Sequence, residues 1–252
     1  RDEIGELGRA FNSMAEGLES AGRLRRNMTA AVAHELRTPL SNVQGYVEAL
    51  RDGLLEPDTA TLNTIHDQVL YLSRLVEDLK LLAETEADDF RLCREPGPLD
   101  EVLRSSVDAF RPRADARDVS VSLALPSETP ELAFDRTRIA QVVGNLLENA
   151  IRHTGPGGRV AVSLELEGSS AVVTVADSGE GIPADELPYI FERFYRTDPS
   201  RARTTGGAGL GLTIAKQLVD AHGGSIHAES SADAGSRFAF ELPLTGTNGT
   251  QG

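Results

Sequence analysis

The chain has 252 residues, of which 40% are hydrophobic, and its formal net charge at pH 7 is −14. This length and composition allow one or two domains with ordinary apolar cores and argue against a globally disordered protein. The negative charge argues against nonspecific nucleic-acid binding, which needs lysine and arginine to neutralise phosphates, so we expect no nucleic-acid partner. The single cysteine, Cys93, excludes an intramolecular disulfide and a zinc site built from cysteines.

The sequence has no signal peptide and no apolar run near the roughly 20 residues that cross a bilayer. It begins with Arg1 rather than methionine, so we expect a fragment of a longer protein. Any contact with a membrane is expected only through segments upstream of this fragment.

The opening segment has apolar residues at alternating steps of three and four, the heptad pattern of a coiled coil. These residues are Ile4, Leu7, Phe11, Met14, Leu18 and Ala21. The next step, to Leu24, is again three, which locally overwinds a coiled coil and indicates a junction between two helical modules.

Heptad steps resume after His34 and predict a long helical hairpin. The first helix has its apolar seam at Leu36, Leu40, Val43, Val47, Leu50 and Leu54. Gly53 and Pro57 predict a turn near 53–57. The second helix continues the seam at Leu62, Ile65, Val69, Leu72, Val76 and Leu79. Because a hairpin that is apolar over more than one seam cannot bury itself, we expect two copies to form a four-helix bundle in a homodimer.

The run Glu95-Pro96-Gly97-Pro98 predicts a domain boundary, after which the periodicity changes. Beyond it, the patterns predict strands over 119–125, 159–166, 171–176, 225–229 and 237–242, and helices over 135–152 and 213–221. This mixture indicates an α+β class, here an α/β sandwich with one sheet against a helical layer.

On the first helix, His34 lies two positions before the seam residue Leu36, which turns it about 200° away from the seam. His34 should therefore face solvent, and Thr38, one turn further on, should share that face. Pro39 has no N–H to bond the carbonyl of Glu35, so we expect a bend just below the histidine.

The residues around His34 suit phosphoryl acceptance. An unprotonated imidazole nitrogen is a good nucleophile near neutral pH. The neighbouring Glu35 can orient the ring and take its other proton during attack. An exposed histidine is more often an ordinary solvated residue, but the interior proline and the polar neighbours in an otherwise regular seam favour a functional role here.

The helix predicted over 135–152 carries Asn145, Asn149 and Arg152 at i, i+4 and i+7, which makes one polar stripe. An asparagine amide oxygen can ligate Mg²⁺, and an arginine can pair with phosphate. Without other evidence, a solvated helix face explains this stripe better than a binding site does.

Two glycine-containing loops follow. Asp177 ends a predicted strand and precedes Gly179 and Gly181; a carboxylate suits the exocyclic amine of adenine. The run Gly206 to Gly211 opens into a helix, where free backbone N–H groups can bind phosphate. Each loop alone also fits an ordinary turn, and the spacing matches neither a P-loop nor a dinucleotide fingerprint.

In order along the chain, these motifs resemble bacterial two-component sensor histidine kinases. The run from Ala33 to Leu40 resembles their phosphoacceptor box. Asn149, the Asp177 loop, Phe191-Glu192-Arg193-Phe194 and the 206–211 run resemble their N, G1, F and G2 boxes. The resemblance implies the ATP-binding fold that these kinases share with Hsp90, type II topoisomerases and MutL.

The resemblance also implies roles for the acceptor residues. His34 accepts the phosphoryl group, Glu35 aids its transfer, and Thr38 positions water to dephosphorylate a partner response regulator. Phosphorylation within one subunit and across the dimer are both compatible with the periodicity.

For the donor site, the resemblance implies bound ATP and Mg²⁺. Asn149, assisted by Asn145, ligates the metal, and Asp177 reads adenine. The nucleotide-binding set is Asn145, Asn149, Arg152, His153, Asp177, Gly179, Gly181, Arg196, Gly207, Gly209, Leu210 and Gly211. Within this set Arg152 and Arg196 contact the γ-phosphate, and His153 takes a position near adenine. Phe191 and Phe194 anchor a lid between Thr197 and Thr205.

The implied domains are a HAMP-like signalling helix over 1–22, a dimerisation and phosphotransfer domain over 23–92, a linker over 93–97 and a catalytic ATP-binding domain over 98–244, with a disordered tail over 245–252. We expect the cytoplasmic portion of a sensor anchored in the inner or plasma membrane. It would use ATP to phosphorylate His34 and pass the phosphoryl group to an aspartate in a receiver domain, and it would also act as a phosphatase. The alternatives are an ATP-driven clamp or chaperone and a nonenzymatic coiled-coil scaffold.

Overall fold

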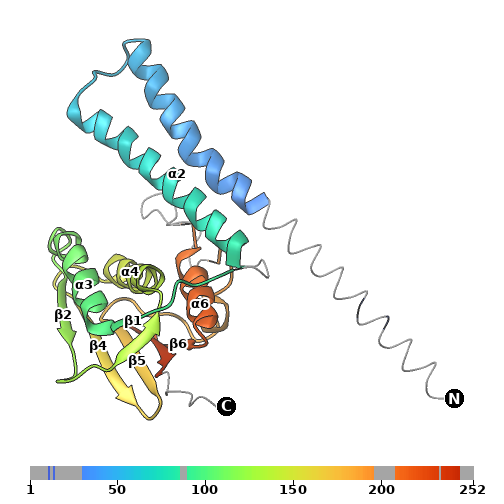
Figure 1. Ribbon diagram of the computed structural model, residues 1–252. Coiled ribbons are helices and arrows are strands. Elements are labelled where there is room, and N and C mark those ends of the chain that lie inside the picture. Colours follow the sequence, from blue (N-terminus) through green and yellow to red (C-terminus); the bar gives the residue numbers. More distant parts are fainter. Residues whose placement is uncertain are drawn as a thin grey trace. The chain divides into compact units, whose positions relative to one another are not determined.

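The computed structural model describes residues 30–85, 90–195, 208–232 and 234–244, together with Phe11 and Met14. The chain divides into two compact units, residues 1–77 and 78–252, which we describe separately (Figure 1). Apart from Phe11 and Met14, the expected signalling helix over 1–22 lies outside the described residues, as does the tail over 245–252. Within the described ranges, no helix has both the length and the apolar character needed to cross a membrane.

The first unit is a helical hairpin. A helix over residues 30–51 runs antiparallel beside the first part of α2 (Thr59–Thr85) (Figure 1). The turn predicted near 53–57 is confirmed: Gly53 has a φ of +70°, which glycine adopts without strain. At the start of α2, the carboxylate of Asp58 accepts a 2.7 Å hydrogen bond from the N–H of Thr61. This hydrogen bond lowers the pKa of the Asp58 carboxyl.

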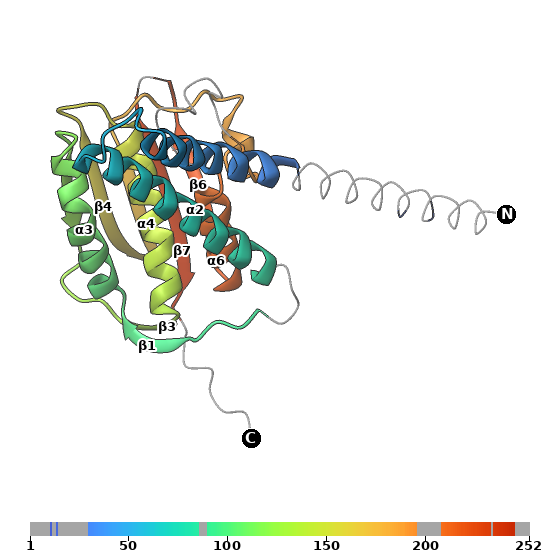
Figure 2. The same ribbon diagram turned by 90° about the horizontal axis from the view of Figure 1, so that it is seen from above.

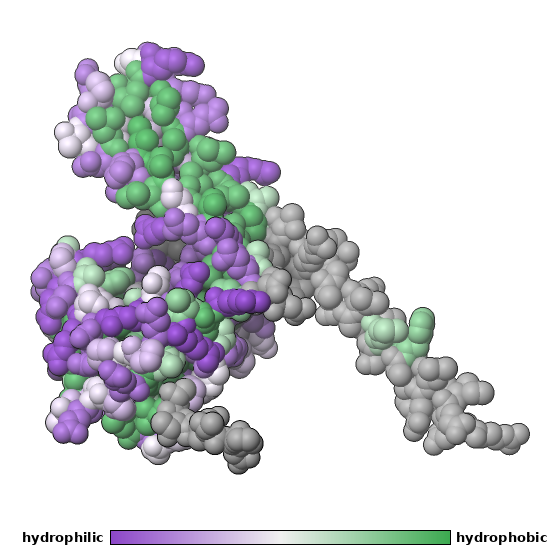
Figure 3. Space-filling view, in the orientation of Figure 1, coloured by the Kyte–Doolittle hydropathy of each residue, from purple (hydrophilic) through white to green (hydrophobic). Residues whose placement is uncertain are grey.

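The heptad positions of the hairpin separate into two rows. One row is half-buried within the single chain and contains Leu36, Val43, Leu50, Ile65, Leu72 and Leu79. The other row, which we call the open row, is exposed and contains Leu40, Val47, Leu54, Leu62, Val69 and Val76. Figure 3 shows apolar side chains along the hairpin. An exposed apolar face this long calls for a partner surface.

The second unit is built on a mixed sheet, which among the described residues has five strands in the order β2-β4-β5-β7-β6. Its strands are β2 (Ser120–Ala124), β4 (Arg159–Glu167), β5 (Ser170–Asp177), β6 (Ser225–Ser230) and β7 (Ser236–Pro243). Only β2 and β4 pair in parallel. Helices α3 (Leu99–Asp115), α4 (Arg136–His153) and α6 (Gly211–Ala221) cover one face of the sheet (Figure 2). This arrangement confirms the α/β sandwich.

The core lies between the sheet and the helices. Along β4, Val160, Val162 and Leu164 are buried in strict alternation, because alternate side chains of a strand point to the same face. On α4 the four residues predicted to point inward are all fully buried: Ile139, Val143, Leu146 and Ala150. The helical period of the sequence therefore identified the buried face of α4 correctly, and the strand predicted over 159–166 is confirmed as β4.

Some elements differ from the sequence prediction. Where the sequence predicted only a boundary, β1 (Glu95–Pro98) pairs antiparallel with β3 (Glu131–Phe134). Two prolines are tolerated in β1 because this small sheet has only edge strands. Helix α3 was not predicted, although its buried residues have helical spacing.

His222, at the end of α6, joins that helix to the start of α4. Its Nδ1 donates to the carbonyl oxygen of Leu218 at 2.7 Å, and its Nε2 accepts from the N–H of Asp135 at 3.1 Å. Asp135 is the N-cap of α4 and accepts from the N–H of Arg138 at 3.1 Å. Since the side chain of His222 is only 4% exposed, burial lowers its pKa below the ordinary 6.5.

Candidate functional site

The residues predicted to accept the phosphoryl group, which we call the acceptor region, lie on the helix over 30–51. His34 is exposed and Leu36 is half-buried, so the predicted orientation of the histidine is confirmed. Thr38 is also exposed, and its hydroxyl donates to the carbonyl oxygen of His34 at 3.4 Å. The helix continues through the buried Pro39 without interruption. The imidazole and the threonine hydroxyl are thus both available on the solvent side of one helix.

Glu35 has a contact that its spacing in the sequence did not predict. Tyr71, on α2, donates from its hydroxyl to Glu35 Oε2 at 3.4 Å. Both side chains are half-buried. The structure thus adds Tyr71 to the acceptor region, although the sequence analysis passed over this aromatic residue beside the seam residue Leu72.

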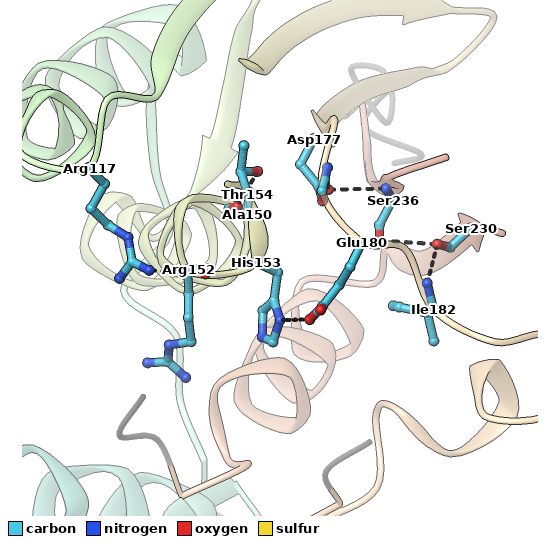
Figure 4. Close-up of polar contacts among 11 residues, drawn as sticks. Arg117, Ala150, Arg152, His153, Thr154, Asp177, Glu180, Ile182, Ser230 and Ser236 are labelled. Carbon is cyan, nitrogen blue, oxygen red and sulfur yellow. Dashed lines mark hydrogen bonds and ion pairs between the residues drawn. The ribbon is translucent and has the colours of Figure 1, made fainter. Parts of the chain in front are cut away.

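In the second unit, Asp177 lies at the end of β5 and is half-buried. Its Oδ1 accepts from the N–H of Gly179 at 2.8 Å and from the N–H of Ser236 at 3.2 Å (Figure 4). Burial raises the pKa of this carboxyl, and the two backbone hydrogen bonds oppose that shift. Among the described residues nothing bonds to Oδ2, which leaves this oxygen for a ligand.

The two glycines after Asp177 are required by close backbone contacts. A Cβ on Gly179 would lie 2.2 Å from the carbonyl oxygen of His153, at the end of α4. Gly181 has a φ of +72°, and a Cβ there would lie 2.0 Å from the carbonyl oxygen of Ser231. The loop after β5 is therefore held tightly between α4 and the turn that follows β6.

Three residues that the sequence analysis missed support this loop. Ser236 donates its N–H to Asp177, as described above, and a Cβ on Gly235 would lie 2.0 Å from the Asp177 carbonyl oxygen. Ser230 accepts from the N–H of Ile182 at 2.8 Å (Figure 4). Its hydroxyl also donates to the carbonyl of Gly235 at 2.7 Å. Small residues in the turn between β6 and β7 were the available signal, but nothing in the sequence connected them to Asp177.

His153 and Glu180 point toward one another at the rim of this site (Figure 4). His153 Nδ1 lies 2.9 Å from Glu180 Oε1, and the two side chains are 40% and 49% exposed. The N–H of Glu180 also donates to the His153 carbonyl at 3.4 Å. A ligand that approaches Asp177 from the end of α4 would meet the His153 ring in an orientation that Glu180 restrains.

The three residues of the polar stripe on α4 have different surroundings. Asn145 Nδ2 donates to the carbonyl of Gly211 at 3.0 Å, which ties α4 to the start of α6. Asn149 is half-buried, and its amide bonds to no residue that the structure describes. Arg152 Nη2 lies 3.4 Å from Glu148 Oε1, so a ligand phosphate would compete with this carboxylate. Asn149 is thus the stripe residue with its side chain most available to a ligand.

The start of α6 has the features of an anion site. Its N-cap, Leu210, is buried and provides no side-chain hydrogen bond, so the first N–H groups of the helix have no side-chain cap. Gly209 has a φ of +69°, and a Cβ there would lie 2.8 Å from the Tyr195 carbonyl oxygen. The N–H of Phe194 donates to the Gly209 carbonyl at 3.2 Å. The F and G2 segments therefore contact each other directly.

Phe191 is anchored separately. Its ring meets the buried ring of Phe238 edge-on, with centroids 6.4 Å apart. Its carbonyl accepts from the hydroxyl of Thr213 at 3.0 Å, which fixes the F segment to α6. Arg196, Gly207 and the expected lid over 197–205 lie outside the described residues.

These groups fit a magnesium nucleotide. Asp177 offers a carboxylate for an amine, the uncapped start of α6 offers N–H groups for phosphate, and Asn149 offers an amide oxygen. In the described part of the chain, no three His, Cys, Asp or Glu side chains are grouped to hold a metal. A Mg²⁺ ion bound mainly by phosphates, water and one or two amide oxygens does not need such a group.

Family models match three consecutive parts of the chain. Residues 1–20 match the HAMP domain, and residues 24–88 match the His Kinase A (phospho-acceptor) domain. Residues 134–246 match the histidine kinase-, DNA gyrase B-, and HSP90-like ATPase. These matches have the same order along the chain as the motifs identified from the sequence.

Among curated proteins, the chain is 38% identical over 243 residues to signal transduction histidine-protein kinase BaeS of Escherichia coli (strain K12). The alignment covers 96% of this chain and 52% of BaeS. The chain thus spans about half the length of the curated relatives that it matches.

The solved structures that are similar to this chain are also histidine kinases. Acinetobacter baumannii histidine kinase AdeS matches with a TM-score of 0.71 and 29% identity, over 84% of this chain and 98% of that one. The catalytic domain of histidine kinase ThkA matches with a TM-score of 0.54 and 32% identity, over 60% of this chain and 95% of that one. ThkA in complex with response regulator protein TrrA matches with a TM-score of 0.70 and 31% identity, over 87% of this chain and 61% of that one.

Proposed function

The chain belongs to the sensor histidine kinases of two-component systems, and we propose that it transfers the γ-phosphoryl group of ATP to its own His34 and then to an aspartate of a response regulator. The observation that carries this proposal is the Asp177 carboxylate, whose Oδ1 is fixed by two backbone N–H groups while Oδ2 is left for a ligand. That arrangement suits the exocyclic amine of adenine. An exposed histidine with an acidic neighbour, on the same chain, supplies the acceptor.

In the proposed reaction, one ring nitrogen of His34 forms a bond to the γ-phosphorus. The bond from that phosphorus to the β–γ bridging oxygen breaks, and its electron pair leaves with ADP. The proton on the other ring nitrogen passes to Glu35. Positioning and charge neutralisation provide most of the catalysis in such a transfer.

On the donor side, Asp177 holds adenine, and Gly179 and Gly181 shape its pocket beside His153. The start of α6, with Gly207, Gly209, Leu210 and Gly211, receives the phosphates, and Arg152 and Arg196 neutralise their charge. We assign the metal to Asn149 and Asn145; since the Asn145 amide nitrogen bonds to Gly211, its oxygen remains for the ion. When bound, Mg²⁺ would neutralise negative charge on the phosphates.

We propose a homodimer paired through the open row and a response regulator receiver domain as phosphoryl acceptor. The match of residues 24–88 to a phospho-acceptor domain and the similarity to ThkA, solved with a response regulator, support these partners. Thr38, exposed beside His34, would position water for dephosphorylation of the regulator. The HAMP match over 1–20 supports our proposal that this is the cytoplasmic portion of a membrane-anchored sensor.

Two other functions explain less. An ATP-driven clamp would use the same nucleotide site, but it gives no role to the exposed His34 and its polar neighbours. A nonenzymatic scaffold gives no role to Asp177, to the restrained glycines after it, or to the uncapped start of α6.

The test is labelling of the chain with γ-³²P ATP, followed by acid and base treatment. We expect acid-labile, base-stable label in the wild-type chain, as for a phosphoramidate, and no label in His34→Gln. The variant should still bind nucleotide, because His34 is not part of the donor site. Label that persists in His34→Gln, or that survives acid, would contradict the assignment of His34.

A further inference from the structure

The hydrogen bond between Tyr71 and Glu35 connects the two helices of the hairpin beside the acceptor histidine. The residues are 36 positions apart, and Tyr71 Oη donates to Glu35 Oε2 at 3.4 Å. Among the described residues, no other group bonds to this carboxylate. The contact is therefore a product of how the hairpin packs, and it selects where the Glu35 side chain lies.

Glu35 needs such a restraint if it is to receive a proton. It follows His34 directly, so the two side chains leave the helix about 100° apart. A glutamate has three rotatable side-chain bonds, and only some of its rotamers bring an oxygen near the neighbouring ring. A hydroxyl that holds Oε2 from the opposite helix limits these rotamers while Oε1 remains able to accept a proton.

We propose that Tyr71 is a positioning residue for phosphoryl transfer to His34, and that it acts by holding the Glu35 carboxylate. This inference rests on the proposed function, in which Glu35 takes the ring proton of His34. Tyr71 touches neither the nucleotide nor the imidazole in this scheme. Its effect should therefore appear in the rate of the chemical step and not in nucleotide binding.

The test compares Tyr71→Phe with Tyr46→Phe in the full chain. Tyr46 is also half-buried on the hairpin, but it makes no hydrogen bond to any residue that the structure describes. Loss of the hydrogen bond from Tyr71 to Glu35 should lower the autophosphorylation rate at saturating ATP about 3- to 10-fold, with the KM for ATP unchanged. Tyr46→Phe should keep the wild-type rate.

A double-mutant cycle with Glu35→Gln separates positioning from general damage. If Tyr71 acts through Glu35, Tyr71→Phe should cause no further loss in the Glu35→Gln background. Additive losses, or a wild-type rate in Tyr71→Phe, would overturn the inference while leaving phosphorylation of His34 intact. An unlabelled wild-type chain would instead overturn the proposed function, and a wild-type rate in Glu35→Gln would remove the role of Glu35 on which the inference depends.

Discussion

At the residue scale, the adenine-binding role that we propose for Asp177 is combined with a cost to folding. Its carboxylate is held by the N–H groups of Gly179 and Ser236, but burial raises its pKa, which means that the folded domain disfavours the ionised form. A raised pKa in the folded state favours folding most at pH values below the ordinary 3.8, and this contribution is lost as pH rises through the folded-state pKa. At pH 7 the stabilising contribution of the raised pKa is thus lost, and the charge at Asp177 is present for the adenine contact that we propose.

Substitution Asp177→Asn should separate these two effects. The amide oxygen can still accept both backbone hydrogen bonds, but the amide nitrogen would present a donor to the adenine amine, so we expect affinity for ATP to fall by at least about tenfold. The melting temperature of the nucleotide-free chain at pH 7 should equal or exceed that of the wild type. Calorimetric titration with a nonhydrolysable ATP analogue and thermal unfolding measure the two quantities.

The matched control is Asp220→Asn, at an exposed position on the last turn of α6. It should change neither the affinity nor the melting temperature by more than the experimental error. Wild-type affinity in Asp177→Asn would show that this carboxylate does not read the base.

At the element scale, His222 determines how α6 meets α4. Only the neutral tautomer with a proton on Nδ1 can donate to Leu218 and accept from the N–H of Asp135 at the same time. If Nε2 of His222 were protonated, its N–H would face the N–H of Asp135, and neither group could accept the other's hydrogen bond. Burial of the ring is the largest cause of the lowered pKa of His222.

This geometry predicts that the stability of the second unit depends on pH. Below the ordinary pKa of 6.5, His222 is protonated in the unfolded chain, whereas in the folded chain it stays neutral to lower pH. The free energy of unfolding should therefore fall as the pH falls from 7.5 to 5.5. His222→Gln should cost about 1–3 kcal/mol at pH 7.5, because one buried partner is left without a hydrogen bond. The variant should also lose part of the slope with pH, as measured by urea unfolding at each pH.

His227→Gln provides the control, because His227 is exposed on β6. It should retain both the stability and the slope of the wild type. An unchanged slope in His222→Gln would mean that other groups cause the acid sensitivity.

At the scale of the whole molecule, the open row is the feature that demands a partner. Each heptad of the hairpin places one apolar residue against the neighbouring helix and leaves another exposed, for example Val47 at 51% and Val69 at 44%. A second copy offers the same surface, so a symmetric pairing would cover both. Association of two hairpins then buries what one hairpin cannot.

The substitution Val47→Glu tests this pairing. Two glutamates forced into an apolar interface would each be left without a counter-charge, so we expect dimer affinity to fall by at least about 100-fold. Leu166→Glu, at a 41% exposed position near the end of β4, should leave the dimer intact. Sedimentation equilibrium measures both; wild-type affinity in Val47→Glu would show that the open row lies outside the interface.

The sequence by itself determined what depends on local periodicity. Heptad steps located the hairpin and predicted that His34 faces solvent, strand alternation located β2, and helical spacing placed Asn149 opposite the core side of α4. These properties follow from the 3.6- and 2-residue periods of the backbone, which any stretch of chain carries within itself. Ordered motifs were enough to assign the family.

Only the tertiary structure decided which distant groups meet. It brought Tyr71 to Glu35 and Ser236 to Asp177, paired β1 with β3, and separated the open row from the half-buried one. Such contacts depend on the packing of elements many residues apart, and a period within one element contains no information about the atoms that another element will place beside it. For that reason the sequence pointed to His34, the proposed phosphoryl acceptor, but did not point to Tyr71, which we propose positions Glu35 beside it.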